Sequence, residues 1–306
     1  MASWNELLSE FESLKNRHGE WLDEGITESL SSIGRLRNNR MVLLYGSSFL
    51  QRPPTPWGVE QIISEDINGF MSCIYGMDFD VGLTLLLHTP GGSPNAAETI
   101  VKYLRSKFND LEVIIPAFAM SAGTMISLSA DRIIMGRQSQ MGPIDPQMPA
   151  PHGAMVSAQA VVDQFMLARQ DVLENETTAH IWAPILPALG PSLLVEAQNA
   201  LKYGERMVAE WLGQWMLDGD MTRAAEVARH FNDATTHGSH GRRVDREEAR
   251  RLGLIVKDLE ESQELQDAVL KAYHLMTIMF EQAPVVKLIR SSTDRRWIKQ
   301  QVPVSQ

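Results

Sequence analysis

Hydrophobic residues in the first half of the chain form short continuous runs, separated by stretches with helical spacing. The runs MVLLYGSS at 41–48, VGLTLLLHT at 81–89, LEVIIPA at 111–117 and DRIIMG at 131–136 are suited to strands that are buried on both faces. Between them, PNAAETIVKYLRSKF at 94–108 has helical periodicity and a proline at a suitable first helical position. Strands joined by helices of this length need right-handed crossovers, so the pattern predicts an α/β fold with a mainly parallel sheet.

The segments on either side of this region are patterned as helices. Near the start of the chain, apolar residues recur at helical spacing, and Ser3 with Glu6 forms a capping-box pattern. Beyond residue 150 the pattern is again helical, and the end of the chain is locally basic. The expected organisation is a helical N-terminal arm at 1–38, a main domain at 39–260, and a C-terminal helix with a basic tail at 261–306.

Composition narrows the class of protein. The 306 residues are 44% hydrophobic and 22% charged, as in ordinary soluble globular proteins, and the net charge of -10 disfavours nucleic acid as a partner. Cys73 is the only cysteine, so the chain has no internal disulfide and no cysteine-rich metal site. Glu6 and Glu10 stand where a secretory signal would be basic, and no run approaches the roughly 20 apolar residues of a membrane span. We therefore expect a cytoplasmic protein without membrane contact, cofactor or metal.

Three stretches combine the residue types that acyl-transfer chemistry needs. TPGG at 89–92 follows a buried strand, AMSAG places Ser121 between a strand and a helix, and SQMGPIDPQ carries Asp145 in a rigid loop. Because parallel sheets usually hold their sites at the carboxyl ends of the strands, the first two stretches should lie together. Taken singly, each has an ordinary structural interpretation: a turn, a helix N-cap and a carboxylate that accepts backbone N–H bonds.

The order of these stretches resembles a known family. LLLHTPGG, PAFAMSAGTMISLSADRIIMG, MGPIDPQ and HGRRVDREEARRLGL are similar to the ClpP/crotonase-fold serine peptidases, within the signal-peptide-peptidase-A-like branch that includes the serine dehydrogenase proteinases. The resemblance is dense over residues 81–148, loose over 198–256, and absent at both ends of the chain. It implies a repeated β-β-α/β-α-β spiral core with a helical N-terminal arm and a helical C-terminal part.

The resemblance assigns roles to individual residues. Ser121 is expected to be the nucleophile, with an oxyanion hole formed by the N–H groups of Gly91, Gly92 and Ala122. Ala122 stands where this branch commonly has glycine, but the substitution keeps the backbone N–H. Fixed dipoles of this kind stabilise the charge that develops on oxygen, each donor contributing about 3 kcal/mol.

The general base is open at this point. Asp145 occupies the position at which Clp peptidase has histidine, and Lys202 is the first lysine after Ser121, as a serine-lysine pair would require. Lys202 shares its predicted helical face with polar residues, which favours a solvated surface unless a second subunit covers it. The histidines at 88, 237 and 240 are competing bases, although each has an ordinary structural interpretation as well.

The sequence thus predicts a serine endopeptidase that acts on peptides or unfolded proteins through an acyl-enzyme at Ser121. The resemblance also implies a homo-oligomer. Two alternatives remain open: an inactive scaffold that recruits a partner, and a crotonase-like enzyme acting on acyl-CoA thioesters. The second lacks support because the sequence has no phosphate-binding or adenine-binding signature.

Overall fold

The computed structural model describes residues 3–14, 16–51, 58–149, 155–188, 190 and 192–301. The chain forms two compact units, each described by itself below. Unit 1 comprises Met1–Met141 and Val244–Gln306, and unit 2 comprises Gly142–Arg243. This division differs from the expected boundaries at residues 38 and 260, because the N-terminal helices and the C-terminal segment both join the core of unit 1.

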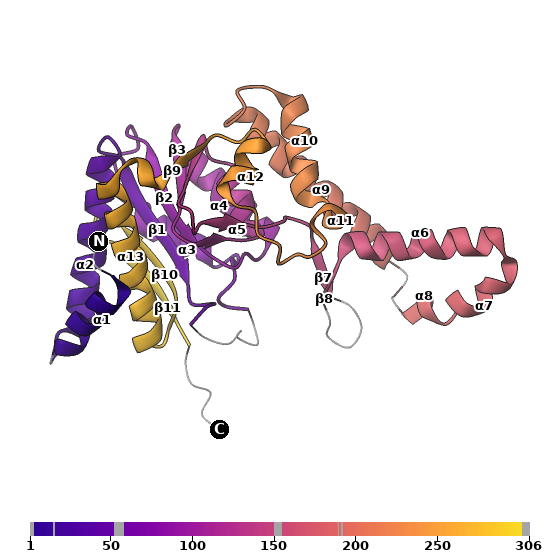
Figure 1. The fold of residues 1–306 in the computed structure, drawn as a ribbon, viewed down its shortest axis with the longest axis horizontal. Helices are drawn as coiled ribbons and strands as arrows, with labels where there is room; N and C mark the ends of the chain where they lie inside the picture. The colour runs from indigo at the N-terminus through magenta and orange to yellow at the C-terminus, as the bar shows by residue number, and fades with distance from the viewer. Residues whose placement is uncertain are drawn as a thin grey trace. The chain divides into compact units, whose positions relative to one another are not determined.

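Unit 1 is built on a seven-stranded sheet of order β11-β10-β1-β2-β3-β5-β9 (Figure 1). In this sheet, neighbouring strands among β1, β2, β3, β5 and β9 pair in parallel. The strand β10 pairs antiparallel with both β1 and β11. The predicted α/β fold with a mainly parallel sheet is therefore confirmed. The strands are β1 (Met41–Ser47), β2 (Leu83–His88), β3 (Leu111–Ile115), β5 (Arg132–Met135), β9 (Val256–Asp258), β10 (Val285–Ser291) and β11 (Arg296–Gln300).

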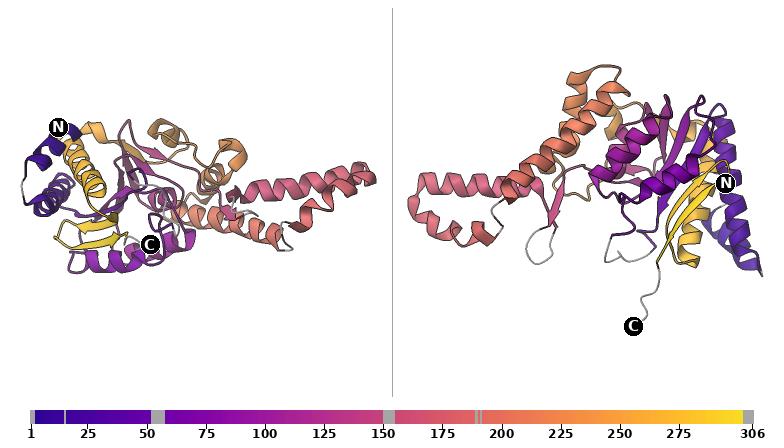
Figure 2. Two further views of the ribbon diagram at one scale, coloured as in Figure 1. Left: turned by 90° about the horizontal axis from the view of Figure 1, so that it is seen from below. Right: turned by 180° about the vertical axis from the view of Figure 1, so that it is seen from behind.

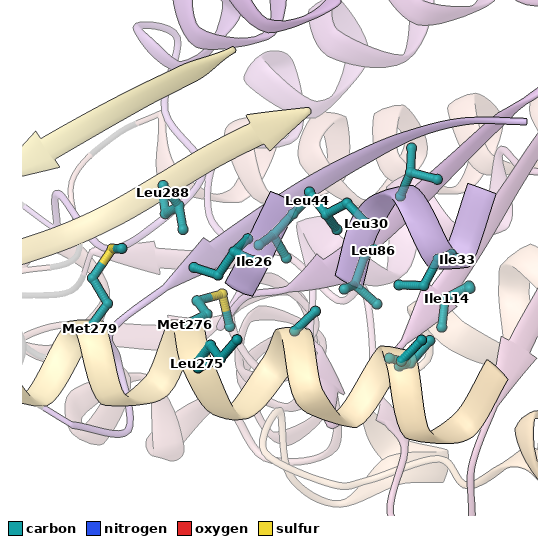
Figure 3. Packing of buried hydrophobic residues seen from close by; sticks show 14 of the residues in the cluster. Ile26, Leu30, Ile33, Leu44, Leu86, Ile114, Leu275, Met276, Met279 and Leu288 are labelled. Atoms are coloured by element: carbon teal, nitrogen blue, oxygen red, sulfur yellow. The ribbon is translucent and has the colours of Figure 1, made fainter. Parts of the chain in front are cut away.

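One face of the sheet is covered by the first two helices and the last one. Ile26 and Leu30 of α2 pack with Leu275 and Met276 of α13 onto buried strand residues such as Leu44 (Figure 3). The capping box predicted at the start of the chain is present, with its serine and glutamate bonded to each other's backbone N–H. These helices are α1 (Trp4–Ser13), α2 (His18–Leu36) and α13 (Gln263–Gln282).

The helices α3 (Asp66–Ile74), α4 (Pro94–Arg105) and α5 (Ala122–Leu128) lie on the opposite face of the sheet (Figures 1 and 2). The helix α4 begins with the predicted proline, and Ser93 caps it by accepting from the Ala96 N–H. The short strands β4 and β6 pair in parallel and form a separate two-stranded sheet. The elements are α3 (Asp66–Ile74), α4 (Pro94–Arg105), α5 (Ala122–Leu128), α12 (Arg246–Arg251), the 3-10 helix η3 (Leu259–Glu261), β4 (Phe118–Ala119) and β6 (Gln140–Met141).

The basic C-terminal segment is not a free tail over its described part. It forms β10 and β11, and all seven residues of β10 are buried. Its two buried cations are paired: Lys287 with Asp66, and Arg290 with Asp23. The excess of basic residues in the local sequence suggests a solvated tail. In the structure, carboxylates from distant parts of the chain pair with these cations and allow the strand to be buried.

Unit 2 is mainly helical, as the pattern beyond residue 150 predicts. The helix α6 follows a β7–β8 hairpin, and α7 and α8 run back beside it (Figures 1 and 2). In the described part of the chain, no helix combines the length and apolar character that crossing a membrane would need. The elements are β7 (Gln147–Pro149), β8 (Met155–Ser157), α6 (Ala158–Glu174), the 3-10 helix η2 (Glu176–Thr178), α7 (Ala179–Trp182), α8 (Ile185–Ala188), α9 (Leu193–Gln214), α10 (Met221–Asn232) and α11 (Ala234–His237).

Candidate active site

Ser121 joins β4 to α5 through a strained backbone. Its φ of 50° and ψ of -115° lie outside the regions that residues other than glycine normally adopt. The Gly123 N–H donates to the Met120 carbonyl at 2.8 Å and closes the turn. Ser121 stands at the N-cap position of α5, but its side chain makes no capping hydrogen bond. The N-cap interpretation therefore does not explain the serine, and strain of this kind is typical of functional turns.

The segments TPGG and AMSAG lie against each other, as their places after parallel strands predict. The Thr89 N–H donates to the Phe118 carbonyl at 2.9 Å, and the Met120 N–H donates to the Thr89 carbonyl at 3.1 Å. A β-carbon built on Gly91 would lie 2.6 Å from the β-carbon of Ser121, a distance that real structures essentially never show. Glycine is thus required at 91 for the two segments to approach.

Gly92 is required for a different reason. Its φ is 150°, and a β-carbon on it would lie 2.3 Å from the backbone oxygen of Ile62. The Ile62 N–H donates to the Gly91 carbonyl at 2.7 Å, and the Ser93 N–H donates to the Ile62 carbonyl at 2.8 Å. Ile62 therefore holds the glycine loop through two backbone hydrogen bonds. The sequence interpretation did not include this residue, since nothing in its local sequence marks the contact.

Of the three N–H groups expected to form an oxyanion hole, two are available. The Gly91 N–H already donates to the Thr89 hydroxyl at 3.2 Å. For the N–H groups of Gly92 and Ala122, the described residues provide no hydrogen-bond partner. Ala122 is the first residue of α5, where backbone N–H groups have no partner within the helix. Gly92 and Ala122 thus flank Ser121 with free donors.

His88 lies near this loop but is enclosed in the core. Its side chain is fully buried among the rings of Phe49, Phe118 and Tyr273. Its Nδ1 accepts from the Phe118 N–H at 3.4 Å, and burial lowers the pKa of His88 to about 3. A neutral, inaccessible imidazole is a structural residue, in agreement with the ordinary interpretation of this histidine.

Unit 2 contains a histidine-carboxylate pair. His240 Nδ1 lies 2.7 Å from Asp145 Oδ1, and Gln147 Nε2 donates to Asp145 Oδ2 at 2.7 Å. Asp145 is 1% exposed, whereas 31% of the His240 side chain is exposed. Both line a cavity of about 330 Å³ within unit 2, together with Gln147, Ser157 and neighbouring residues. Among the described residues, Asp145 is therefore held by side chains, and not by the backbone N–H groups that the sequence suggested.

The two other sequence candidates in unit 2 are placed differently. Both ring nitrogens of His237 are occupied, because Nε2 lies 2.7 Å from the His230 carbonyl oxygen and Nδ1 lies 3.1 Å from Arg242. Lys202 is exposed on α9. In contrast, Nε2 of His240 has no hydrogen-bond partner among the described residues. Within the described ranges no three histidine, cysteine or carboxylate side chains gather as metal ligands.

The structure thus brings Ser121, Gly91, Gly92 and Ala122 together in unit 1. Asp145 and Lys202 belong to unit 2. The sequence already contained His240 among several histidines, but its partner stands 95 positions earlier in the chain. A close contact over such a separation cannot be inferred from one sequence.

Comparisons with curated proteins find relatives of unknown function. One uncharacterized protein of Methanocaldococcus jannaschii is 30% identical over 203 residues, which make up 64% of this chain and 60% of that protein. A second uncharacterized protein of the same organism is 41% identical over 87 residues, 28% of this chain and 30% of that protein. The chain therefore matches less than two thirds of the length of either relative.

Similar solved structures are peptidases with low sequence identity. Two are mutants of the 1510-N membrane-bound stomatin-specific protease, at 18% and 19% identity, each with a TM-score of 0.40. They cover 66% and 64% of this chain and 77% and 71% of their own chains, and the second is in complex with a substrate peptide. A mutant of ClpP1 from Listeria monocytogenes has 15% identity and a TM-score of 0.36, and covers 76% of this chain and 97% of its own.

A family model gives the most direct assignment. Residues 59–178 match the model described as ClpP-like SDH-type serine proteinase. The matched range contains Ser121, the glycine loop and Asp145, whereas Lys202 and His240 lie beyond it. Over residues 59–178 the chain is thus similar to the ClpP-like serine proteinases of SDH type, the family that its motifs resemble.

Proposed function

We propose that the protein is a serine endopeptidase in which Ser121 attacks the peptide carbonyl and forms an acyl-enzyme. The observation that carries this proposal is the strained backbone of Ser121, packed against Gly91 with its hydroxyl unused as a helix cap. A serine held in this way at a strand-helix turn presents its hydroxyl outward, as in other nucleophile turns. The family match supports the same chemistry.

The N–H groups of Gly92 and Ala122 are proposed to stabilise the oxyanion. They come from the two segments that meet at Ser121, and neither has an assigned partner among the described residues. Donors fixed in the backbone need no reorganisation when charge develops on the carbonyl oxygen. The Gly91 N–H is proposed to support the loop instead, because it already donates to Thr89.

As a candidate general base, unit 2 offers His240, with Asp145 as the residue that orients it. A carboxylate that accepts from Nδ1–H leaves the lone pair on Nε2, so the imidazole can accept a proton there. Asp145 is itself held by Gln147, so the pair has the base-and-orienter arrangement found in acyl-transfer enzymes. This observation favours His240 over His237, whose ring nitrogens are both occupied.

The proposed reaction has two halves. In the first, the Ser121 oxygen bonds to the carbonyl carbon while its proton passes to the general base, and the carbonyl electrons move onto oxygen. The C–N bond then breaks and the leaving amine takes the proton from the base. In the second half, water adds to the ester carbon and gives a proton to the base, and the C–O bond to Ser121 breaks as the serine regains that proton.

Lys202 remains the alternative base. A lysine base must be neutral when it acts, and burial or a neighbouring cation promotes this. Arg206 follows one turn later on α9, but Lys202 is exposed in this chain. The lysine proposal thus requires a second copy of the chain to cover this face.

The substrate class and the assembly are also proposals. A peptide or an unfolded protein fits a nucleophile with two backbone donors, because the scissile amide carbonyl is the group those donors recognise. Homo-oligomer formation and a cytoplasmic location stay predictions.

Replacing Ser121 by alanine tests the proposal. Cleavage of a fluorogenic peptide library and of an unfolded protein by the wild-type chain should fall to background in the Ser121→Ala variant. Thr99→Ala, an exposed change on α4, serves as a matched hydroxyl deletion and should leave cleavage unchanged. Equal cleavage by wild-type protein and the Ser121→Ala variant would exclude Ser121 from the mechanism.

A further inference from the structure

A fully buried ion pair lies on the side of unit 1 that holds the glycine loop. Lys287 of β10 and Asp66 at the start of α3 are both 0% exposed, and Lys287 Nζ lies 2.7 and 2.9 Å from the two Asp66 oxygens. The Tyr45 hydroxyl also donates to Asp66, at 2.8 Å. Desolvation of two charges offsets much of their attraction, so apolar residues of similar size often stabilise a core equally well. The pair therefore calls for a role other than stability.

The pair holds the segment 61–63 at both of its ends. Lys287 Nζ donates to the Gln61 carbonyl at 2.7 Å, and the Ile63 N–H donates to Asp66 Oδ2 at 3.1 Å. The two bonds are charge-assisted, which makes them stronger than bonds between neutral groups. The backbone of Ile62, between them, is thus fixed by the ion pair.

Ile62 in turn fixes the peptide between Gly91 and Gly92. Its N–H donates to the Gly91 carbonyl, and its own carbonyl accepts from the Ser93 N–H. A peptide group is planar, and no peptide bond in the described residues is cis. The Gly92 N–H must therefore point away from the Gly91 carbonyl. By holding that carbonyl, Ile62 sets the direction in which the Gly92 N–H points.

We propose that the buried Lys287–Asp66 pair is a positioning device for catalysis, which aims the Gly92 N–H at the oxyanion through Gln61, Ile62 and Ile63. The inference rests on the proposed function, since it assigns support to one donor of that site. Neither Lys287 nor Asp66 is a catalytic residue here. A glycine at φ 150° has wide conformational freedom, so an external constraint on the loop is physically necessary.

The principal test variant combines Asp66→Asn with Lys287→Met, which removes both charges and leaves none unpaired. Asp66→Asn alone serves as a second variant that keeps the shape of the site. Glu112→Gln is the matched control. Glu112 is also 0% exposed and bonded to Arg37 and Arg132, but it lies near the start of β3, at the far end of the strands from the glycine loop.

Two readouts separate positioning from plain structural support. The first is steady-state kinetics: kcat of the combined variant should fall about 10- to 100-fold with KM within twofold, while Glu112→Gln should lower the melting temperature and leave kcat within twofold. The second is amide hydrogen exchange of peptides covering 61–66 and 89–93, which should quicken in both Asp66 variants and not in Glu112→Gln.

The outcomes distinguish this inference from the peptidase proposal. Unchanged exchange at 89–93 in a folded Asp66 variant overturns the positioning role, whatever the activity. An equal fall of kcat in Glu112→Gln overturns it as well. If the wild-type chain shows no reactive Ser121, the peptidase proposal fails, and the exchange data still decide whether the ion pair holds the glycine loop.

Discussion

Gly91 lies so near Ser121 that a β-carbon on the glycine would be 2.6 Å from the β-carbon of the serine. This contact explains why the loop that packs against Ser121 has glycine at position 91. The glycine allows the serine to approach the loop that supplies the Gly92 N–H. Three consequences of this site and its surroundings can be measured directly.

Replacing Gly91 by alanine should inactivate the protein with only a moderate loss of stability. The new methyl group would move Ser121 or the loop, and a misplacement of about 1 Å can reduce the rate about 100-fold. Gly76→Ala is the control, because Gly76 has a similar positive φ of 80° but nothing within 4 Å of the built β-carbon. Both variants should lose about 1–3 kcal/mol from backbone strain, measured by denaturant unfolding. Peptide cleavage should fall only in Gly91→Ala, and equal cleavage by both variants would refute a role for this contact.

Replacing His240 by alanine tests this residue as the proposed general base. The expected loss in kcat is about 100- to 10,000-fold, and Asp145→Asn should give a loss of similar order because it disturbs the tautomer and orientation of the imidazole. Lys202→Ala should change kcat less than threefold. Steady-state assays of the three variants on one peptide make the comparison. A large loss in Lys202→Ala with activity retained in His240→Ala would assign the base to the lysine instead.

The stability of unit 1 should fall at acidic pH through His88. Burial lowers the pKa of this histidine to about 3 in the folded protein, against about 6.5 in the unfolded chain. Between these values the unfolded state binds a proton on His88 that the folded state does not bind. The free energy of unfolding is therefore unaffected by the titration of His88 above pH 6.5 and decreases as the pH falls toward 3. The slope contributed by one proton is about 1.4 kcal/mol per pH unit.

The variant His88→Asn tests this dependence, because its side-chain oxygen can still accept from the Phe118 N–H and does not titrate. Urea unfolding of both proteins between pH 3.5 and 7 should give a shallower dependence in the variant. Identical pH dependence in the two proteins would show that His88 does not contribute.

The approach of the two turns at Ser121 and Gly91 could be predicted from the sequence because the information is local. Small residues around Ser121 and two glycines after a buried strand indicate a close approach, and parallel strands bring the two segments to one edge. The structure confirms that the two segments meet. It also shows the strained backbone of Ser121, whose dihedral angles cannot be predicted from a residue pattern.

The supporting residues could not be predicted, because each acts through a distant partner. Lys287 stood out only as part of a basic segment, yet its partner Asp66 lies 221 positions earlier. A lysine inside the apolar run VVKLIRS is the one local signal that it is buried and paired. His240 was one of three candidate histidines, and only the contact with Asp145 distinguishes it.

The reactivity of Ser121 toward a fluorophosphonate tests the central claim most directly. A serine nucleophile with an oxyanion hole forms a covalent phosphonyl adduct, which intact-mass analysis detects and peptide mapping locates. We predict one adduct per chain, placed on Ser121 and abolished by Ser121→Ala. A wild-type chain that stays unmodified, or one whose adduct maps to another residue, would contradict the account.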